Sequence, residues 1–412
     1  MRWVRIGAVL LLVGTFCLTF LVDPWQNELV NDVPLYNAYA DRFLDGVVPY
    51  REIGFEYPPL AAPLIALPGL VSLDPETYRY AFAVLVFILA VGVLLTTGRL
   101  AALGGGREWV ALLVVALTPV ATGAMIRTHF DLAPVLCLVA GLVAVGTGRV
   151  KTGFALFGIG GALKLFPLVA VPIAVAWLIG RGRRREAAAG LVVAAVAVAL
   201  TIGAGVAMSA DGASNAVEYH VDRPVQIESL PATVLNAIEE AGGEAPKPVQ
   251  SFRSDGLEHP AADAVTVGFL VLLAIALIAL TVAAARVDDV RGLGLAGLAA
   301  AAAVASLGKV LSPQFMLWLV PLAAVAWAWG MWALALVTTA AISVTPVWFP
   351  DRYFDLVARD DFPLAAVAGR NVLLLLMLAL AAWEIRRLVR ASRAVVRSTP
   401  QARPAVPRSA LR

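Results

Sequence analysis

Residues 262–285 read ADAVTVGFLVLLAIALIALTVAAA, and Asp263 is the one charged residue among them. A helix needs about 20 consecutive apolar residues to cross the hydrocarbon core of a bilayer. A strand of a membrane β-barrel would instead alternate apolar and polar residues, which this run does not do. The stretch therefore predicts a membrane-spanning α-helix and indicates a helical membrane protein.

The composition extends this conclusion to the whole chain. Of its 412 residues, 60% are hydrophobic and 15% are charged, and the mean hydropathy is +0.83. When Gly is counted in place of Tyr, the apolar share is about 66%, against roughly 45–50% in soluble domains. A soluble globular protein is excluded. The two cysteines, Cys17 and Cys137, lie within apolar runs and predict neither a disulfide nor a metal pair.

Similar apolar runs recur along the chain and predict twelve spans, with the short pair within 152–180 forming a helical hairpin. The runs cover residues 3–22, 78–98, 108–126, 131–148, 152–164, 165–180, 187–209, 262–285, 291–310, 314–329, 331–347 and 365–385. An even number of crossings places both termini on the same side of the membrane. The predicted fold is an all-α polytopic membrane protein of about twelve helices, with two large external loops, 23–77 and 211–261.

Charged residues sort the connecting segments into two groups. On the side of the termini, the short loops hold twelve basic residues and the C-terminal segment holds eight more. The loop 23–77 holds nine carboxylates and two arginines, and the loop 211–261 with adjacent Asp263 holds ten carboxylates and three basic residues. By the positive-inside rule, both termini are cytoplasmic and both large loops are external. The net charge of +3 thus reflects topology and does not predict nucleic-acid binding.

Two segments complete the predicted organisation. Residues 58–73 are apolar but number only 16 and include four prolines, so we interpret them as a juxtamembrane or re-entrant segment. Residues 1–390 then form a single transmembrane domain. Residues 391–412 are rich in Arg and Pro and predict a disordered, basic cytoplasmic tail that can lie on anionic lipid.

The first external loop combines carboxylates, aromatic residues and prolines at the membrane surface. Asp32 and Tyr36 lie near its start, and Tyr57 precedes two prolines. Such a mixture suits a substrate that has a polar head group and an apolar tail. The alternative is a solvated acidic loop with an interfacial aromatic belt.

Ionisable residues also occur at the external end of a predicted span. Arg127, His129 and Asp131 lie at the start of the fourth apolar run, where charge is costly unless it is paired or faces a cavity. These three residues are candidates for substrate binding. An i,i+4 pair between Arg127 and Asp131 that anchors the helix end is the alternative. His129 alone predicts no metal site.

Lysines near helix-breaking prolines are candidates for holding an anionic head group. Lys164 is followed by Leu-Phe-Pro, and Lys309 is followed by a Ser-Pro-Gln-Phe segment that contains Gln314. Either lysine could instead snorkel to the membrane surface.

The second external loop contains a dense polar cluster shortly after a span. Arg223 could clamp a phosphate through its planar guanidinium, with His220 close by, and Gln226 and Glu228 could bind sugar hydroxyls. The alternative is an amphipathic surface helix with a wet polar face. We expect the later part of this loop, 239–258, to be flexible because it is charged and contains Gly and Pro.

Together these segments resemble glycosyltransferase family 87, bacterial membrane enzymes of the GT-C type that take a sugar from a polyprenyl phosphate carrier. The matching segments are Asp32 to Tyr36, Tyr57-Pro58-Pro59-Leu60, Lys164-Leu165-Phe166-Pro167, Tyr219-His220 with Arg223 and Gln226-Ile227-Glu228-Ser229, and Ser312-Pro313-Gln314-Phe315 with Trp318 and Pro321. The resemblance implies a GT-C-type helical bundle with its active site at the external face. It also implies polyprenyl-phosphate mannose as the donor, and a catalytic carboxylate early in the first external loop, where Asp32 lies.

The chemistry implied by this resemblance needs few groups. A sugar on polyprenyl phosphate already has a good leaving group, so one base for the acceptor hydroxyl and cations for the departing phosphate suffice. Asp32 is the expected base, and Arg223 with Lys309 or Lys164 supplies the cations. One in-line displacement would invert the anomeric centre. We expect no metal or other cofactor, a glycolipid or glycan acceptor, and a location in the plasma membrane.

Two other function classes stay open when the residues are considered alone. A transporter or flippase of a lipid-linked or anionic substrate would use Lys164, Asp131 and Lys309 as a path through the membrane. It predicts charges deep in several spans, whereas the charged clusters here lie at one predicted face. An inactive structural subunit is the other alternative.

Overall fold

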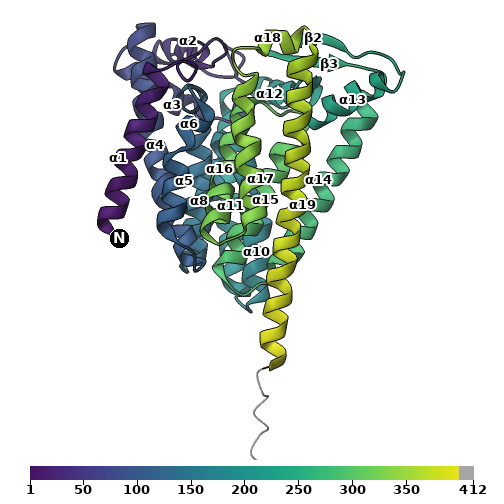
Figure 1. The fold of residues 1–412 in the computed structure, drawn as a ribbon. Helices are drawn as coiled ribbons and strands as arrows, with labels where there is room; N and C mark the ends of the chain where they lie inside the picture. Colours follow the sequence, from purple (N-terminus) through teal and green to yellow (C-terminus); the bar gives the residue numbers. More distant parts are fainter. Residues whose placement is uncertain (399–412) are drawn as a thin grey trace, which may run out of the picture.

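The computed structural model describes residues 1–398 and is predominantly helical (Figure 1). The α-helices are α1 (Arg2–Leu21), α2 (Val33–Leu44), α3 (Ala61–Ala66), α4 (Pro75–Leu103), α5 (Glu108–Ala116), α6 (Thr118–Thr122), α7 (Met125–Thr128), α8 (Leu132–Gly146), α9 (Val150–Leu163), α10 (Ala170–Gly180), α11 (Arg184–Met208), α12 (Ala210–Asp222), α13 (Leu230–Glu240), α14 (Ala262–Ala284), α15 (Val290–Leu307), α16 (Met316–Ala328), α17 (Trp332–Val344), α18 (Tyr353–Val357) and α19 (Asp361–Ser398). Short 3-10 helices and strands complete the fold: η1 (Leu67–Leu70), η2 (Phe166–Val169), η3 (Pro313–Phe315), η4 (Thr345–Val347), β1 (Val225–Gln226), β2 (Lys247–Ser251) and β3 (Ser254–Glu258).

Six of the helices described in residues 1–398 are long and apolar enough to cross a membrane: α1, α4, α11, α14, α15 and α19. Six further apolar segments contain 10–17 residues each: Ala61–Leu70, Leu132–Gly146, Val150–Leu163, Phe166–Gly180, Pro313–Ala328 and Trp332–Val347. Each predicted apolar run falls on a helix or on consecutive helices. The helical membrane fold is therefore confirmed. The count of twelve crossings stays a prediction, because several helices are shorter than a bilayer is thick.

The two ends of the bundle differ. Helices α2, α12, α13 and α18 gather with strands β2 and β3 at one end, which we call the loop end (Figure 1). Helix α1 begins, and the described part of α19 ends, at the opposite end. This arrangement agrees with an even number of crossings. It also brings the two long predicted loops, 23–77 and 211–261, to the same end of the bundle.

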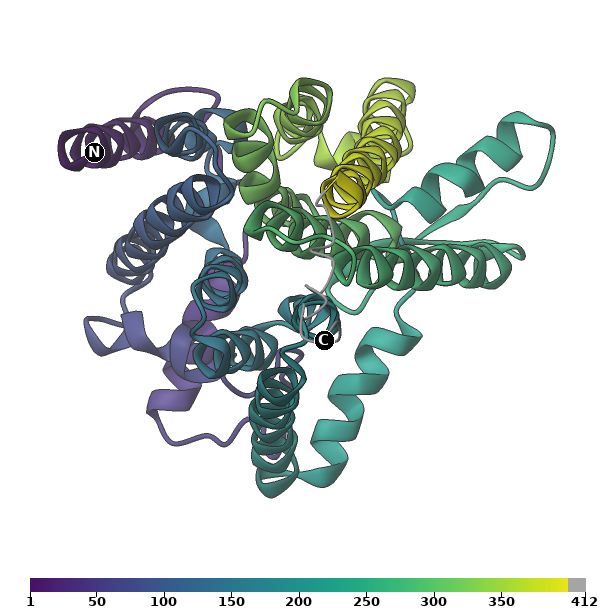
Figure 2. The same cartoon turned by 90° about the horizontal axis from the view of Figure 1, so that it is seen from below.

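Helix α15 is the most deeply packed of the membrane-length helices. In its apolar stretch of 18 residues, 83% of the residues are buried, against 11% in the corresponding stretches of α11 and α14. Its sequence, VRGLGLAGLAAAAAVASL, consists largely of Gly and Ala, and small residues let neighbouring helices approach closely. It packs against α8, α10, α14, α16 and α19. By contrast, α1 lies at the edge of the bundle in the view from below (Figure 2).

The loop 211–261 is more regular than expected. Strands β2 and β3 pair as an antiparallel hairpin, and β1 pairs with the other edge of β3. The hydroxyl of Tyr219 donates to the carbonyl of Phe252 at the hairpin tip. The prediction of a flexible segment over 239–258 is wrong, because the ladder and this anchor satisfy its backbone. The small sheet is also the one departure from an all-α fold within residues 1–398.

Two other predicted segments can be compared with the structure. Helix α3 and η1 together contain ten residues, about 15 Å at 1.5 Å per residue, which is half of a hydrocarbon core of about 30 Å. This segment is too short to span. Helix α19 continues through 391–398, where a disordered tail was expected, and residues 399–412 lie outside the described part of the chain. Cys17 and Cys137 are both free.

Candidate active site

Asp32 lies immediately before α2, at the loop end of the bundle. The amide of Val33 donates to the side-chain oxygen of Asn31 at 3.0 Å, and the Asp32 carboxylate makes no helix-cap hydrogen bond. A proline in the first turn of α2 fixes the helix start. The Asp32 side chain is 31% exposed. The carboxylate is thus held in place by its backbone and remains open to a substrate.

Tyr36, one turn along α2, fixes the direction of this carboxylate. Its hydroxyl donates to Oδ2 of Asp32 at 3.0 Å. Its ring is buried, with ring centroids 6.2 Å from Tyr57, 5.3 Å from Phe82 and 5.6 Å from Phe130. Burial, and secondarily the charge of Asp32, raise the pKa of Tyr36. The phenol therefore stays protonated and keeps donating to Asp32.

His129 faces Asp32 from the connection between α7 and α8. Its Nε2 lies 3.5 Å from Oδ2 of Asp32, and its Nδ1 lies 3.2 Å from the carbonyl oxygen of Met125 and 3.0 Å from the hydroxyl of Thr128. A carbonyl only accepts, and the Thr128 hydroxyl already donates to the carbonyl of Ala124, so Nδ1 carries a proton. Its Nε2 therefore faces the carboxylate of Asp32.

Asp131, at the start of α8, is buried and paired. Its Oδ1 accepts from Nζ of Lys164 and from Nε1 of Trp318, both at 2.7 Å. The indole of Trp318 is stacked between Phe166, at a centroid distance of 3.8 Å, and Phe315, at 4.0 Å. Within residues 1–398, Oδ2 of Asp131 has no hydrogen-bond partner. This cluster joins the Leu-Phe-Pro and Ser-Pro-Gln-Phe segments, which lie about 150 residues apart in the sequence.

Arg127 does not pair with Asp131. Its guanidinium forms an ion pair with Glu28, donates from Nε to the carbonyl of Thr19 at 3.1 Å and lies 4.0 Å from the ring centroid of Phe20. The proposed i,i+4 pair is wrong because α7 ends one residue after Arg127 and the next residue is extended. Arg127 is 2% exposed, and these contacts make it an anchor between α1 and the loop 23–77.

Helix α12 brings a second group of candidates to the loop end. Nε2 of His220 donates to the carbonyl of Glu56 at 2.9 Å and so joins the loop 23–77 to the loop 211–261. Burial lowers the pKa of His220, and the charge of Arg223 acts in the same direction. Nζ of Lys309 donates to the carbonyl of Val221. The buried Nε of Arg223 has no partner among residues 1–398, which leaves this guanidinium and Lys309 as neighbouring cations.

Gln226 and Glu228 are buried, at 3% and 0% exposure. Gln226 donates to one carboxylate oxygen of Glu228 at 3.0 Å, and the indole of Trp348 donates to the other at 2.8 Å. Arg370 and Asn371 of α19 donate to the Glu228 carbonyl at 2.6 and 3.1 Å. Burial raises the pKa of Glu228. This geometry favours a brace between the second loop and α19 over contact with sugar hydroxyls.

Apart from Arg127, the predicted residues therefore fall into three groups. The first surrounds the carboxylate of Asp32 and consists of Tyr36, Tyr57 and His129. The second is centred on Asp131 and Lys164, with Gln314 half-buried beside the aromatic stack. The third lies along and after α12 and contains His220, Arg223 and Lys309, with Gln226 and Glu228 buried beneath. Within residues 1–398, no three His, Cys, Asp or Glu side chains are placed to hold a metal ion.

Several partners in the site were missed by sequence reasoning. Glu28 pairs with Arg127, and Glu56 binds Arg253 of the hairpin tip. Neither pairing has a sequence signal, because the partners come from different loops. Arg370 could have been found, since an arginine inside an apolar run indicates a buried partner.

The chain matches the model of glycosyltransferase family 87 over residues 55–313, more than half of its length. It belongs to glycosyltransferase family 87. The family 87 match and the six membrane-length helices together make the protein a multi-pass membrane glycosyltransferase. They favour an enzyme over the transporter or flippase considered above. A search of curated proteins finds no match.

The family 87 match covers the candidates unevenly. It includes those from Tyr57 to Lys309, whereas Asp32 and Tyr36 precede it and Gln314 follows its last residue. The enzyme class thus rests on the match, and the choice of a catalytic base rests on geometry.

Proposed function

We propose that this family 87 enzyme transfers mannose from a polyprenyl-phosphate carrier to a hydroxyl group of a glycolipid or glycan acceptor. The observation that carries the proposal is the partly exposed carboxylate of Asp32, which accepts a hydrogen bond from Tyr36 and faces His129. A lipid-linked donor suits a site at the end of a membrane bundle, because the carrier reaches the site from the bilayer while its head group stays in water.

The proposed reaction is a single displacement with inversion at the anomeric carbon. Asp32 accepts the proton of the acceptor hydroxyl as its oxygen attacks that carbon. The bond between the carbon and the phosphate oxygen breaks, and the phosphate leaves with the electron pair. The hydrogen bond from Tyr36 and the contact with His129 hold the base in one orientation.

Arg223 and Lys309 supply the charge that stabilises the departing phosphate in this proposal. The buried Nε of Arg223 is free of partners among residues 1–398, and a guanidinium can bind a phosphate through two parallel hydrogen bonds. The backbone of Val221 holds Lys309 beside it. We assign Lys164 a positioning role instead, because its ammonium is already neutralised by Asp131 at 2.7 Å.

We propose further that the loop end is external and that the protein lies in the plasma membrane with cytoplasmic termini. The charge asymmetry supports this orientation, since the start of α1, the short loops and the described end of α19, all opposite the loop end, hold seventeen basic residues. Nucleotide sugars are absent outside the cell, so an external site accords with a lipid-linked donor.

The test is transfer of radiolabelled mannose from polyprenyl-phosphate mannose to membrane glycolipids by the purified protein in nanodiscs, with the Asp32→Asn variant beside it. We expect labelled product from the wild type alone. Product from both would show that the base lies elsewhere. Product from neither would contradict mannose as the donor sugar, and other polyprenyl-linked sugars would then be tried.

A further inference from the structure

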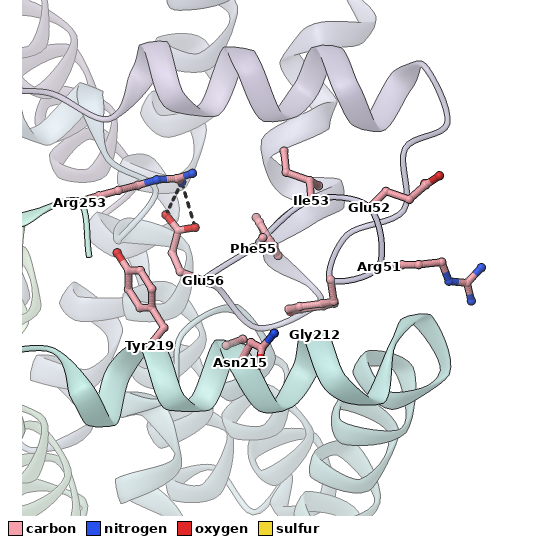
Figure 3. Close-up of a pocket in the computed structure, with 12 residues that line it drawn as sticks. Arg51, Glu52, Ile53, Phe55, Glu56, Gly212, Asn215, Tyr219 and Arg253 are labelled. Carbon is pink, nitrogen blue, oxygen red and sulfur yellow. Dashed lines mark hydrogen bonds and ion pairs between the residues drawn. The ribbon is translucent and has the colours of Figure 1, made fainter. Parts of the chain in front are cut away.

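A cavity of about 400 Å³ lies between residues 50–56 of the first external loop and α12 (Figure 3). Its volume falls in the range of roughly 300–1,000 Å³ that is typical of small-molecule sites. The side chains on which the argument depends are Tyr50, Phe55, Glu56, Asn215, Tyr219 and Arg253. The transfer chemistry proposed above uses none of them.

An ion pair closes one end of this cavity. Arg253 donates to both carboxylate oxygens of Glu56 at 3.2 Å and also to the hydroxyl of Tyr39. The carboxylate is 10% exposed and the guanidinium 50% exposed. Arg51 and Glu52 also line the cavity and carry opposite charges (Figure 3). The cavity therefore has no net charge.

The backbone around the cavity is strained. Tyr50 has a φ of 67°, and Phe252 and Arg253 at the hairpin tip each have a φ of 51°. Among residues 1–398, Arg359 is the one other non-glycine residue with positive φ. This conformation is unfavourable for residues other than glycine, and such residues cluster at ligand sites. Gly212 permits the close approach of α12, because a Cβ there would lie 1.8 Å from the carbonyl oxygen of Tyr50.

The lining of the cavity suits a sugar ring. The carboxylate of Glu56 accepts hydrogen bonds, and the amide of Asn215 both donates and accepts, so together they can bind neighbouring hydroxyl groups. Tyr219, which is half-buried, supplies aromatic surface against the less polar face of a ring. Because the cavity carries no net charge, it favours a neutral ligand over a phosphate or a uronic acid.

The cavity lies directly beside the candidate base. Glu56 precedes Tyr57, and the ring of Tyr57 contacts that of Tyr36, whose hydroxyl binds Asp32. The side chains of Tyr57 and Tyr36 therefore connect a ligand in the cavity to the reacting centre. An extended substrate can occupy both places.

We propose that this cavity binds a neutral hexose ring of the acceptor glycan, remote from the hydroxyl that reacts; this inference rests on the proposed function. Asn215 precedes Arg223 by eight residues, about 12 Å along α12 at 1.5 Å per residue. A donor sugar bonded directly to a phosphate at Arg223 is too short to reach the far end of the cavity at Asn215. An acceptor of two or more sugar units reaches both the cavity and Asp32.

Saturation-transfer difference NMR on the full-length protein in nanodiscs tests the proposal, with methyl α-D-mannopyranoside and methyl α-D-glucopyranoside as neutral probes and methyl β-D-glucuronide as an anionic one. We expect binding of a neutral probe. The Asn215→Trp variant fills the cavity and should weaken binding about tenfold or more. The matched Glu218→Trp variant places the same bulk on α12 outside the lining and should bind normally. Asn215→Leu removes the amide alone and should weaken binding about threefold.

The results separate this proposal from the proposed function. Equal probe binding by wild type and Asn215→Trp, no binding of either neutral probe, or preference for the glucuronide would each overturn it. The Asp32→Asn variant should keep normal probe binding although it loses transfer. If the proposed function fails, Asp32→Asn will transfer the sugar normally. The NMR measurement reports probe binding alone and does not depend on this transfer. Asn215 is exposed, and melting temperatures check that its variants fold.

Discussion

The two sides of the candidate site are built differently. Helix α2, which starts beside Asp32, has four buried residues, whereas α12, which leads to Arg223, has none. Near Asp32, aromatic rings pack around the polar groups, and the carboxylate of Asp131 binds both Lys164 and Trp318. Near Arg223, the described contacts are few. The comparison teaches that the base side is preorganised by packing, while the phosphate side can adjust to an incoming carrier.

The largest effect should come from the base side. We expect Asp32→Asn to lower kcat by about 10²–10⁴-fold, because an amide cannot accept the proton of the acceptor hydroxyl. The melting temperature should not change, since Asp32 is partly exposed and caps no helix. Asp45→Asn, at the exposed end of the same helix, is the matched control. A wild-type kcat for Asp32→Asn would show that Asp32 is not the base and that the preorganised side of the site does not carry the chemistry.

The buried pair should matter for stability more than any residue on the phosphate side. Asp131→Ala leaves the ammonium of Lys164 without its partner, and such a change costs about 3 kcal/mol. We therefore expect a lower melting temperature in detergent. The double variant Asp131→Ala/Lys164→Met should recover part of this loss, because it removes the unpaired charge as well. Equal melting of the single variant and the wild type would show that packing around Trp318 does not depend on Asp131.

Arg223 should affect donor binding without affecting folding. Loss of charged hydrogen bonds to the phosphate in Arg223→Gln should raise KM for the donor about 10–100-fold. The KM of Arg223→Lys should lie between those of the wild type and Arg223→Gln, because lysine keeps the charge but cannot form two parallel hydrogen bonds to a phosphate. Melting temperature should stay constant, since α12 has no buried residues. Arg42→Gln on α2 is the control, and a wild-type KM for Arg223→Gln would assign the phosphate to another cation.

The smallest expected effect concerns pH. Burial lowers the pKa of His220, so the folded protein binds this proton less tightly than the unfolded chain does. Its contribution to stability is complete above the ordinary pKa of about 6.5 and is lost as the pH falls towards the lowered value. His220→Gln keeps a donor for the Glu56 carbonyl and does not titrate. Melting curves from about pH 7.5 to 5 should therefore diverge slightly below pH 6.5, and parallel curves would contradict the assignment.

Apolar runs predicted the helices because the length of a membrane helix follows from bilayer thickness, and that constraint acts on each segment by itself. The β2–β3 hairpin escaped prediction for a local reason. Its two turn residues, Phe252 and Arg253, adopt the positive φ that Asn-Gly usually provides in such turns. Composition alone therefore indicated a flexible loop.

The candidate site was predicted better as a set of residues than as a set of contacts. The sequence pattern identified Asp131, Lys164 and Arg127, because charges at the ends of apolar runs are costly. It assigned Arg127 the wrong partner, since i,i+4 spacing has meaning only within a continuous helix. Glu28 becomes the partner of Arg127, and Trp318 becomes a partner of Asp131, through tertiary packing. The spacing of residues along the chain does not encode these contacts.

The stacking of Trp318 between Phe166 and Phe315 makes substitutions in two distant segments interdependent. A smaller side chain at either phenylalanine leaves one face of the indole uncovered and loosens its hydrogen bond to Asp131. Tolerated changes at these positions should therefore occur in compensating combinations. In a library that randomises residues 166, 315 and 318 together, epistasis among them should exceed that of exposed positions on the same helices.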